Sequence, residues 1–212
     1  MYVVALEQEA LPIIEHYKLK AIKGKLKVFK NLGNNIWLII SGIGSRKSSS
    51  AVKYLYKISK SKKDMIWINI GIAGHRNYEP GSILDIKKVT NNKGEVYYTS
   101  SILNNIKTNI SLCVDTPEIK YKGDYVYDME SYGFIKSADK VTIKECIFIF
   151  KIISDNLKYK PISYKKFAYK NIKDNIKRID EILSQNILYL SNSLVSTESV
   201  MKLITKKFHV TF

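Results

Sequence analysis

The stretch Ile66-Trp67-Ile68-Asn69-Ile70-Gly71-Ile72-Ala73-Gly74 decides the fold class of this 212-residue chain. It is a continuous apolar run that ends in Gly-x-x-Gly, a pattern typical of a strand buried on both faces in the middle of a parallel sheet. In open α/β sheets, ligands bind beyond the carboxyl ends of such strands, and glycine lets a bound group approach the backbone. We therefore expect a glycine turn after this strand to form the floor of a binding site.

The composition indicates one domain that spans residues 1-212. Hydrophobic residues make up 45% of the chain, which is enough for a substantial core. No N-terminal signal pattern is visible and no apolar run reaches the roughly 18 residues of a membrane span, so we expect a soluble, cytoplasmic protein that does not bind membranes. Cys113 and Cys146 lie far apart in apolar runs. This placement favours reduced, buried thiols over a disulfide framework or a zinc site, and we expect no metal.

The net charge of +16 raises the question of a nucleic-acid partner. Of the 35 basic residues, however, only Arg46, Arg76 and Arg178 are arginines, the residue type that reads base edges in bidentate geometry. The lysines are scattered over many segments and form no basic stripe that alternates with aromatic residues. We therefore expect a solvated basic surface and no specific nucleic-acid partner.

Three acidic residues stand where a candidate core strand passes into the next element. Glu9 follows the apolar run Tyr2-Val3-Val4-Ala5-Leu6 at the start of a predicted helix, with Pro12 expected in its first turn. Glu130 joins a strand-like run to an amphipathic helix, and Asp155 follows the apolar run 147–153. An acid near a helix start is also favoured by the helix dipole, so Glu9 by itself supports either a structural or a functional interpretation.

A second glycine sequence follows the apolar run 36–40. Ser41-Gly42-Ile43-Gly44-Ser45-Arg46 opens a predicted helix, for which the serines at 48–50 are possible caps. The free N–H groups of such a turn can hold an anion or a sugar hydroxyl. The spacing matches neither a dinucleotide fingerprint nor a Walker loop, so we expect no nucleotide cofactor. His75, just past the central run, is an acid or base candidate, but a lone histidine there is more often a turn residue.

The remaining segments complete an α/β pattern. An edge strand is expected at 27–30, a hairpin between 82–89 and 95–99, and a strand at 110–114. Apolar residues spaced by three and four predict a long helix that covers one face of the sheet: Ile172, Ile176, Ile179, Leu183 and Ile187. A shorter helix is expected around 200–204, before the apolar run 208–212.

Five of these segments, taken in order, carry a family resemblance. Between residue 1 and about residue 157 the chain resembles the nucleoside phosphorylase superfamily, and most of all its methylthioadenosine/S-adenosylhomocysteine nucleosidases. The segments are 7–9 (EQE), 41–44 (SGIG), 69–74 (NIGIAG), 127–130 (YDME) and 153–155 (ISD). The resemblance implies a three-layer α/β/α fold around a twisted mixed central sheet. It also implies cleavage of the N-ribosidic bond of a purine nucleoside by a homodimer, in methionine salvage, without a cofactor.

The resemblance implies a role for each residue that matches a motif. Asp155 would hold the base and protonate its N7, Ser154 would fix Asp155, and Glu9 would orient and deprotonate the attacking water. An acid on the leaving group and a base on the opposite face of the sugar also agree with the general chemistry of glycosidic bonds.

The remaining matched positions would bind the substrate. Glu130 would bind the ribose hydroxyls, with Met129 packed beside the sugar. Gly44, Ile72 and Gly74 are the further substrate-binding candidates.

Two departures leave the substrate and its 5′ substituent open. Ile72 stands where these nucleosidases often have a small polar residue. The segment between Thr90 and Tyr125, which usually supplies the aromatic side chain that stacks on the base, is short.

Two alternatives to hydrolysis remain. Phosphorolysis requires a site for a phosphate dianion, for which arginine is the usual ligand. Only Arg46 and Arg76 are expected nearby, and the acids of 7–9 would repel phosphate. A non-catalytic nucleoside-binding protein of the same fold is the second alternative, against which the presence of all three acids speaks.

Overall fold

The computed structural model describes residues 1–31, 33, 35–63, 65–100 and 106–193, with side chains described up to residue 185. Along these residues the elements are β1 (Tyr2–Val4), α1 (Glu7–Tyr17), β2 (Lys20–Ile22), β3 (Lys27–Lys30), β4 (Trp37–Ile40), α2 (Ser45–Ser59), β5 (Trp67–His75), β6 (Ile83–Asn91), β7 (Val96–Tyr98), β8 (Thr108–Cys113), β9 (Val126–Asp128), α3 (Ser131–Ala138), the 3₁₀ turn η1 (Lys144–Cys146), β10 (Ile147–Asp155) and α4 (Tyr164–Ser193).

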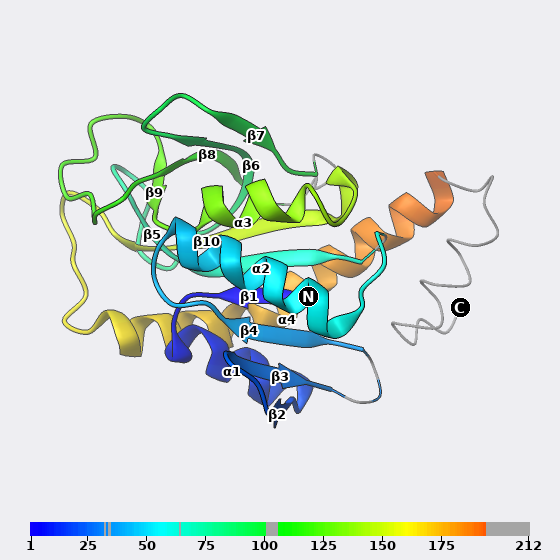
Figure 1. Cartoon of the computed structure of the whole chain (residues 1–212). Coiled ribbons are helices and arrows are strands. Elements are labelled where there is room, and N and C mark those ends of the chain that lie inside the picture. Colours follow the sequence, from blue (N-terminus) through cyan, green and yellow to red (C-terminus); the bar gives the residue numbers. More distant parts are fainter. Residues whose placement is uncertain (32, 34, 64, 101–105, 194–212) are drawn as a thin grey trace.

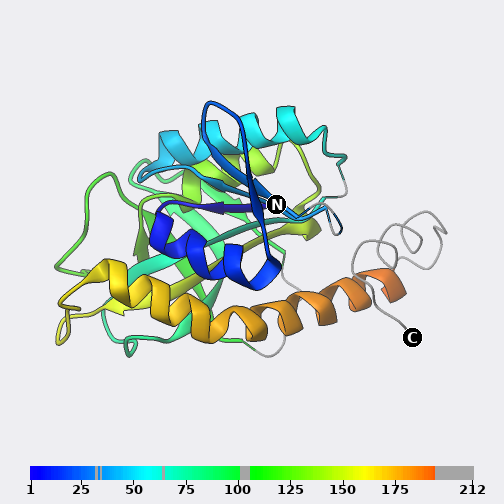
Figure 2. The same cartoon turned by 90° about the horizontal axis from the view of Figure 1, so that it is seen from below.

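The helices cover the sheet on both faces (Figure 1). Helices α2 and α3 pack against each other on one face, while α1 and α4 lie side by side on the other (Figure 2). The predicted stripe on α4 is buried at Ile172, Ile176, Ile179 and Leu183, and the side chain of Ile187 lies outside the described part. The predicted three-layer α/β/α fold with a mixed sheet is confirmed.

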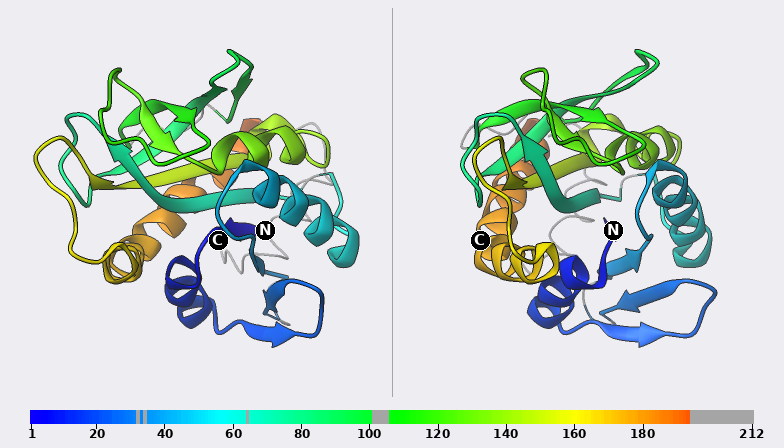
Figure 3. Two further views of the ribbon diagram at one scale, coloured as in Figure 1. Left: turned by 60° about the vertical axis from the view of Figure 1, so that its left-hand side comes forward. Right: turned by 90° about the vertical axis from the view of Figure 1, so that its left-hand side faces the viewer.

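The sheet has the order β10-β6-β8-β9-β5-β1-β4-β3-β2, with β7 paired to β6. At its centre, β5 runs parallel to both β1 and β10. Strand β10 also pairs with β6, β6 with β8, β8 with β9, and β9 with β5. Five strands therefore close into a ring, which Figure 3 shows from two sides. The sequence predicted a twisted sheet but gave no sign of this closure.

Strand β5 differs from its prediction at its end. The expected glycine turn is absent, because the strand continues through Gly71 and Gly74 to His75. Neither glycine has a positive φ. A Cβ on Gly71 would lie 2.9 Å from Glu9 Oε1, and one on Gly74 would lie 2.6 Å from Cε1 of Tyr121. The two glycines are thus used for close approach of other side chains and not for a change of chain direction.

Two predicted helix starts are also displaced. Helix α2 begins at Ser45 after Gly44, whose φ of 107° suits a residue without a side chain, so the serines at 48–50 lie inside the helix and do not cap it. Helix α1 begins at Glu7, which places Pro12 beyond the first turn. Glu9 therefore lies in the first turn, at the junction of β1 and α1 as expected.

The starts of α2 and α3 touch through their backbones. A Cβ on Gly133 would lie 1.8 Å from the carbonyl oxygen of Ser45, far inside any allowed contact. Only glycine permits this crossing. The glycine sequence that precedes α2 and the Glu130 that precedes α3 are consequently held at a fixed separation.

Several smaller predictions can be compared directly. The edge strand, the hairpin of β6 and β7, and β8 are confirmed, and both cysteines are buried thiols. The predicted helix at 200–204 and the run 208–212 lie outside the described residues. Among the helices of the described part, none is both long enough and apolar enough to cross a membrane.

Candidate active site

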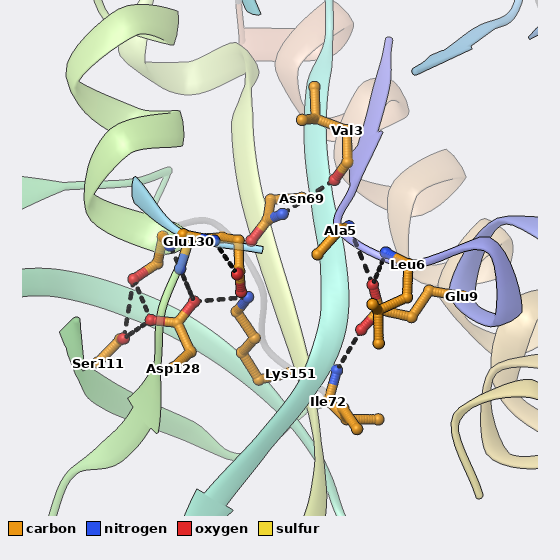
Figure 4. A network of polar contacts seen from close by, with 12 residues as sticks. Val3, Ala5, Leu6, Glu9, Asn69, Ile72, Ser111, Asp128, Glu130 and Lys151 are labelled. Carbon is orange, nitrogen blue, oxygen red and sulfur yellow. Dashed lines mark hydrogen bonds and ion pairs between the residues drawn. The ribbon is translucent and has the colours of Figure 1, made fainter. Parts of the chain in front are cut away.

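A buried lysine organises the first of two polar groups along β5. Lys151 of β10 lies opposite Gly71, and its side chain is 1% exposed. Its Nζ lies 2.7 Å from Asp128 Oδ2 at the end of β9, and 3.6 Å from where a Cβ of Gly71 would be. Figure 4 shows the ammonium group pointing toward the carboxyl groups of Asp128 and Glu130. A charge buried this deeply requires such partners.

Glu130 reaches this group because β9 is antiparallel to β5. Tyr127 pairs with Gly74 and Val126 with His75, so the chain that continues past β9 runs back toward the level of Gly71. There Glu130 is 8% exposed, and its Oε1 accepts a 2.7 Å hydrogen bond from the N–H of Gly44. Two predicted site residues from distant segments are thus in direct contact, at the positive end of helix α2.

The ionisable side chains of this group differ in their pKa values. Burial opposes the charge on Asp128, but the Lys151 ammonium holds the pKa of this carboxyl below its usual range. Burial likewise opposes the charge on Lys151, yet the carboxylates of Asp128 and Glu130 raise its pKa. Burial, together with the charge of Asp128, raises the pKa of Glu130 to about 7. Asp128 and Lys151 therefore form the charged pair, and Glu130 is the group that titrates near neutral pH.

Glu9 joins the same group from the other side of β5. Its Oε2 accepts the N–H groups of Ala5 and Leu6 at 3.0 and 2.9 Å, and its Oε1 accepts the N–H of Ile72 at 3.0 Å. Burial raises its pKa, while these hydrogen bonds and Lys151 act in the opposite direction. Glu9 thus ties the β1–α1 junction to the central strand, and Oε1, which accepts one N–H group, retains a lone pair for a further donor.

The second polar group lies at the end of β10, level with Gly74. Asp155 is 7% exposed and pairs with Gly74 across the two strands. Ser154 Oγ donates to its Oδ1 at 2.5 Å. The hydroxyl of Tyr121 donates to Oδ2. About three residues of extended chain, or roughly 10 Å, separate this group from the one at Gly71.

The other predicted substrate-binding positions border these two groups. Met129 is half-buried between Asp128 and Glu130, and Gly74 is buried beneath Tyr121. Ile72 contributes its backbone N–H to Glu9, a contact that does not depend on the type of its side chain. The structure thus brings Glu9, Gly44, Ile72 and Glu130 together at one end and Ser154, Asp155 and Gly74 at the other.

His75 is the last residue of β5, and its side chain holds the turn that follows the strand. Its Nδ1 accepts the N–H groups of Asn77 and Tyr78 at 3.0 and 3.1 Å, so the ring proton belongs on Nε2. Nε2 lies 3.1 Å from Asp124 Oδ1, and burial lowers the pKa of the ring. Both ring nitrogens of the neutral imidazole are therefore engaged, one with the turn after β5 and the other with Asp124 before β9, and the ring is not free for proton transfer.

The sequence prediction assigns no role to four polar residues of the site: Asp128, Lys151, Asn69 and Tyr121. Lys151 is marked in the sequence as the one charged residue within the apolar run 147–153. Asn69, inside the central run, donates to the carbonyl of Val3 at 2.9 Å, and its Oδ1 is buried in the same region (Figure 4). Tyr121 lies in an irregular segment where nothing in the sequence singles it out.

The cations around the site also bear on the choice of nucleophile. Arg46 and Arg76, the two arginines expected nearby, are both exposed. The buried cation of the site is Lys151, whose ammonium is paired with Asp128. Among the described residues no group of three or more His, Cys, Asp or Glu side chains is arranged to hold a metal ion.

The raised pKa of Glu130 predicts a pH dependence near neutrality. Ionised oxygens accept stronger hydrogen bonds, so in the ribose-binding role that the resemblance implies for Glu130, nucleoside affinity should increase between about pH 6 and about pH 8. Glu130→Gln should bind the nucleoside more weakly, and its affinity should not change with pH over this range.

Stability changes with pH in the opposite sense. Between pH 4.5, the usual pKa of a glutamate, and about pH 7, Glu130 keeps a proton in the native state that it has lost in the unfolded chain. The contribution of Glu130 to the free energy of unfolding therefore falls as pH rises. Calorimetric titrations across this range, and melting curves for both proteins, measure the two effects. A pH-independent affinity in the unmodified protein would contradict the assignment.

Comparison with known proteins gives matches to solved structures alone. No family model matches the chain, and no curated protein matches its sequence. The methylthioadenosine/S-adenosylhomocysteine nucleosidase of Campylobacter jejuni superposes with a TM-score of 0.70 at 17% identity, over 86% of this chain and 96% of its own. Futalosine hydrolase of Helicobacter pylori matches with a TM-score of 0.70 at 15% identity, over 87% and 96%. The methylthioadenosine nucleosidase of Arabidopsis thaliana gives 0.67 at 15%, over 89% and 93%. The resemblance inferred from the sequence is thus confirmed in three dimensions, and the chain has the fold of the nucleoside phosphorylase/hydrolase superfamily.

Proposed function

We propose that the protein hydrolyses the N-ribosidic bond of a purine nucleoside. The observation that carries the proposal is that the buried carboxyl groups lie at two levels along β5. Glu9 and Glu130 lie at the level of Gly71, and Asp155 lies at the level of Gly74. This separation suits a substrate whose sugar lies at one position and whose base lies at the other.

The proposed reaction uses each carboxyl group once. Asp155 donates a proton to N7 of the base, so that the base leaves as a neutral molecule when the bond between N9 and C1′ breaks. Glu9 removes a proton from a water molecule as the water oxygen bonds to C1′. Glu130 accepts hydrogen bonds from the ribose hydroxyls. Protonation of the leaving group and activation of the nucleophile each contribute on the order of 10²–10⁴-fold in such reactions.

Water is the favoured nucleophile because, among the residues that the structure describes, the site offers no unpaired cation for phosphate. The charge of Lys151 is matched by Asp128, and Glu9 adds a further carboxyl group beside it. Arg46 and Arg76 are exposed and take no part in the two polar groups. A phosphate dianion placed here would meet carboxylates without an arginine to balance them.

The proposed substrate is a 5′-substituted purine nucleoside. The structural neighbours include nucleosidases named for 5′-methylthioadenosine and S-adenosylhomocysteine, which carry a substituent on the ribose, and a hydrolase named for futalosine. Activity on methylthioadenosine would place the protein in methionine salvage. No residue of the two polar groups selects one 5′ substituent over another.

Product analysis tests the function. The purified protein should release free purine base from methylthioadenosine, adenosylhomocysteine, adenosine or futalosine without added phosphate, as followed by chromatography. Release that requires phosphate and yields a ribose 1-phosphate would identify a phosphorylase. Absence of release from the whole panel, combined with nucleoside binding, would identify a non-catalytic nucleoside-binding protein.

We also propose that the protein is a homodimer with an apolar interface. The link between β10 and α4, together with the first residue of α4, exposes four large apolar side chains: Leu157 (54%), Tyr159 (45%), Ile162 (108%) and Tyr164 (42%). This link follows directly after Asp155, so a second subunit placed here would also cover the base end of the site.

The dimer is tested by light scattering. The unmodified protein should have twice the 24.4 kDa mass of one chain, and Ile162→Lys should shift it toward the monomer. Ile143→Lys is the control, because Ile143 is another exposed isoleucine (46%) near the start of β10, away from the link. A monomeric unmodified protein at micromolar concentration, or dissociation caused equally by both substitutions, would refute the proposed interface.

A further inference from the structure

Tyr121 closes the end of the candidate site at which Asp155 lies. It belongs to the irregular segment 114–125 between β8 and β9, yet its side chain is 1% exposed. Its hydroxyl donates to Asp155 Oδ2, while Ser154 Oγ lies 2.5 Å from Oδ1. Both oxygens of the proposed acid are therefore already in contact with hydroxyl groups of the chain itself.

The tyrosine ring also covers the floor of this end of the site. A Cβ on Gly74 would meet ring carbons Cε1 and Cζ of Tyr121 at 2.6 and 2.7 Å. The missing side chain at Gly74 leaves room for a flat group, and here the phenol fills that room. A planar base that approaches Asp155 over Gly74 needs the same space.

The backbone of Tyr121 is held in an unfavourable conformation. Its φ is 41°, in the left-handed region that residues with bulky side chains seldom adopt. Such conformations persist only where the surrounding contacts enforce them, and they are concentrated at ligand clamps and switches. Movement of Tyr121 away from Asp155 would release this strain.

The rest of the segment is attached at few points. Asp124 Oδ1 lies 3.1 Å from Nε2 of His75, and the N–H of Gly123 donates to the hydroxyl of Tyr127 at 3.0 Å. The Asp124 side chain is 82% exposed and Ile119 is 58% exposed. The ring of Tyr127 lies 5.5 Å from that of Tyr121, so an aromatic surface remains beside Gly74 when Tyr121 leaves.

We infer that Tyr121 is a specificity-determining residue that a purine base replaces on binding, an inference that rests on the proposed function. In the ligand-free protein the phenol of Tyr121 is hydrogen-bonded to Asp155 and its ring covers Gly74. A base displaces it because its ring stacks over Gly74 and its edge offers Asp155 a hydrogen-bonding partner. A sugar without a base offers neither and leaves Tyr121 in place. The apparent affinity for the base is accordingly the intrinsic affinity multiplied by the fraction of molecules in which Tyr121 is open.

The test combines proteolysis with binding, with adenine as the probe. Lys120 and Lys122, which flank Tyr121, are exposed, so tryptic cleavage after them, followed by mass spectrometry, reports release of the segment. Adenine should accelerate this cleavage in the unmodified protein, whereas ribose should not. Tyr121→Phe should be cleaved faster without ligand. It should also bind adenine roughly ten- to hundredfold more tightly, the range expected from loss of a competing hydrogen bond to a carboxylate. Tyr125→Phe, in the same segment, is the matched control and should behave as the unmodified protein does.

Two results would overturn the inference. Weaker adenine binding by Tyr121→Phe would make the tyrosine part of the base pocket, and slower cleavage with adenine would mean that the segment closes over the ligand. If the unmodified protein hydrolyses nucleosides while Tyr121→Phe leaves adenine affinity and cleavage unchanged, this inference alone fails. If neither protein binds adenine or cleaves any nucleoside, the proposed function fails with it.

Discussion

Asp155→Asn is expected to lower the turnover of a purine nucleoside by about 10²–10⁴-fold, the range typical of a lost general acid. The substitution keeps the shape of the side chain but removes the proton that the base must receive. An amide can still contact the hydroxyls of Ser154 and Tyr121, because a hydroxyl can rotate to accept a hydrogen bond from the NH₂ group. Nucleoside binding should therefore weaken only modestly. Single-turnover kinetics and calorimetry measure the two quantities separately.

Asp139→Asn is the matched control for this change. Asp139 is an exposed acid at the end of α3, so its substitution should alter neither rate nor affinity. Melting curves must show that all three proteins are folded at the assay temperature. Turnover by Asp155→Asn within tenfold of the unmodified protein would remove Asp155 from the role of proton donor.

Glu9→Gln is expected to abolish hydrolysis nearly completely while leaving nucleoside binding intact, because the side chain acts on the attacking water. The structure adds an effect on stability. Glu9 accepts three backbone N–H groups, and an amide in its place turns an NH₂ group toward at least one of these donors. An unmatched buried donor costs about 1–3 kcal/mol. Rates must therefore be compared below the lower of the two melting temperatures.

Glu7→Gln separates these two consequences. Glu7 lies two residues earlier in the same helix turn but is exposed, where it pairs with Lys27. Its substitution should leave both rate and melting temperature nearly unchanged. If Glu9→Gln melts earlier but hydrolyses nucleosides at a near-normal rate, then Glu9 only ties the β1–α1 junction to β5, and another group must activate the water.

The sequence predicted those features that depend on local pattern. The apolar runs of β5 and β10 identify buried strands because a fully buried strand needs apolar residues on both faces. Glu9, Glu130 and Asp155 stand out because each interrupts or ends an apolar run, and the structure confirms that all three are buried. Their catalytic and binding roles remain predictions.

The features that the sequence did not predict depend on contacts between distant segments. The direction of β9 relative to β5 places Glu130 beside Lys151 and not beside Asp155, and a three-residue strand carries no mark of its direction. The glycines of β5 were expected in a turn because glycine is common there. In the structure Gly71 lies against Glu9, 62 positions away in the sequence, and Gly74 lies against Tyr121, 47 positions away. Each glycine is therefore required by a contact with a distant residue.

The backbone contact between Gly133 and Ser45 has a consequence for ligand design. The contact fixes the first turns of α2 and α3 relative to each other. Gly44 and Glu130, which border these turns, are therefore held rigidly at the position proposed for the sugar. The base end is lined instead by a segment with a strained tyrosine and few attachments. Chemical series built on this protein should therefore keep the ribose-like portion constant and explore bulk and polarity on the heterocycle.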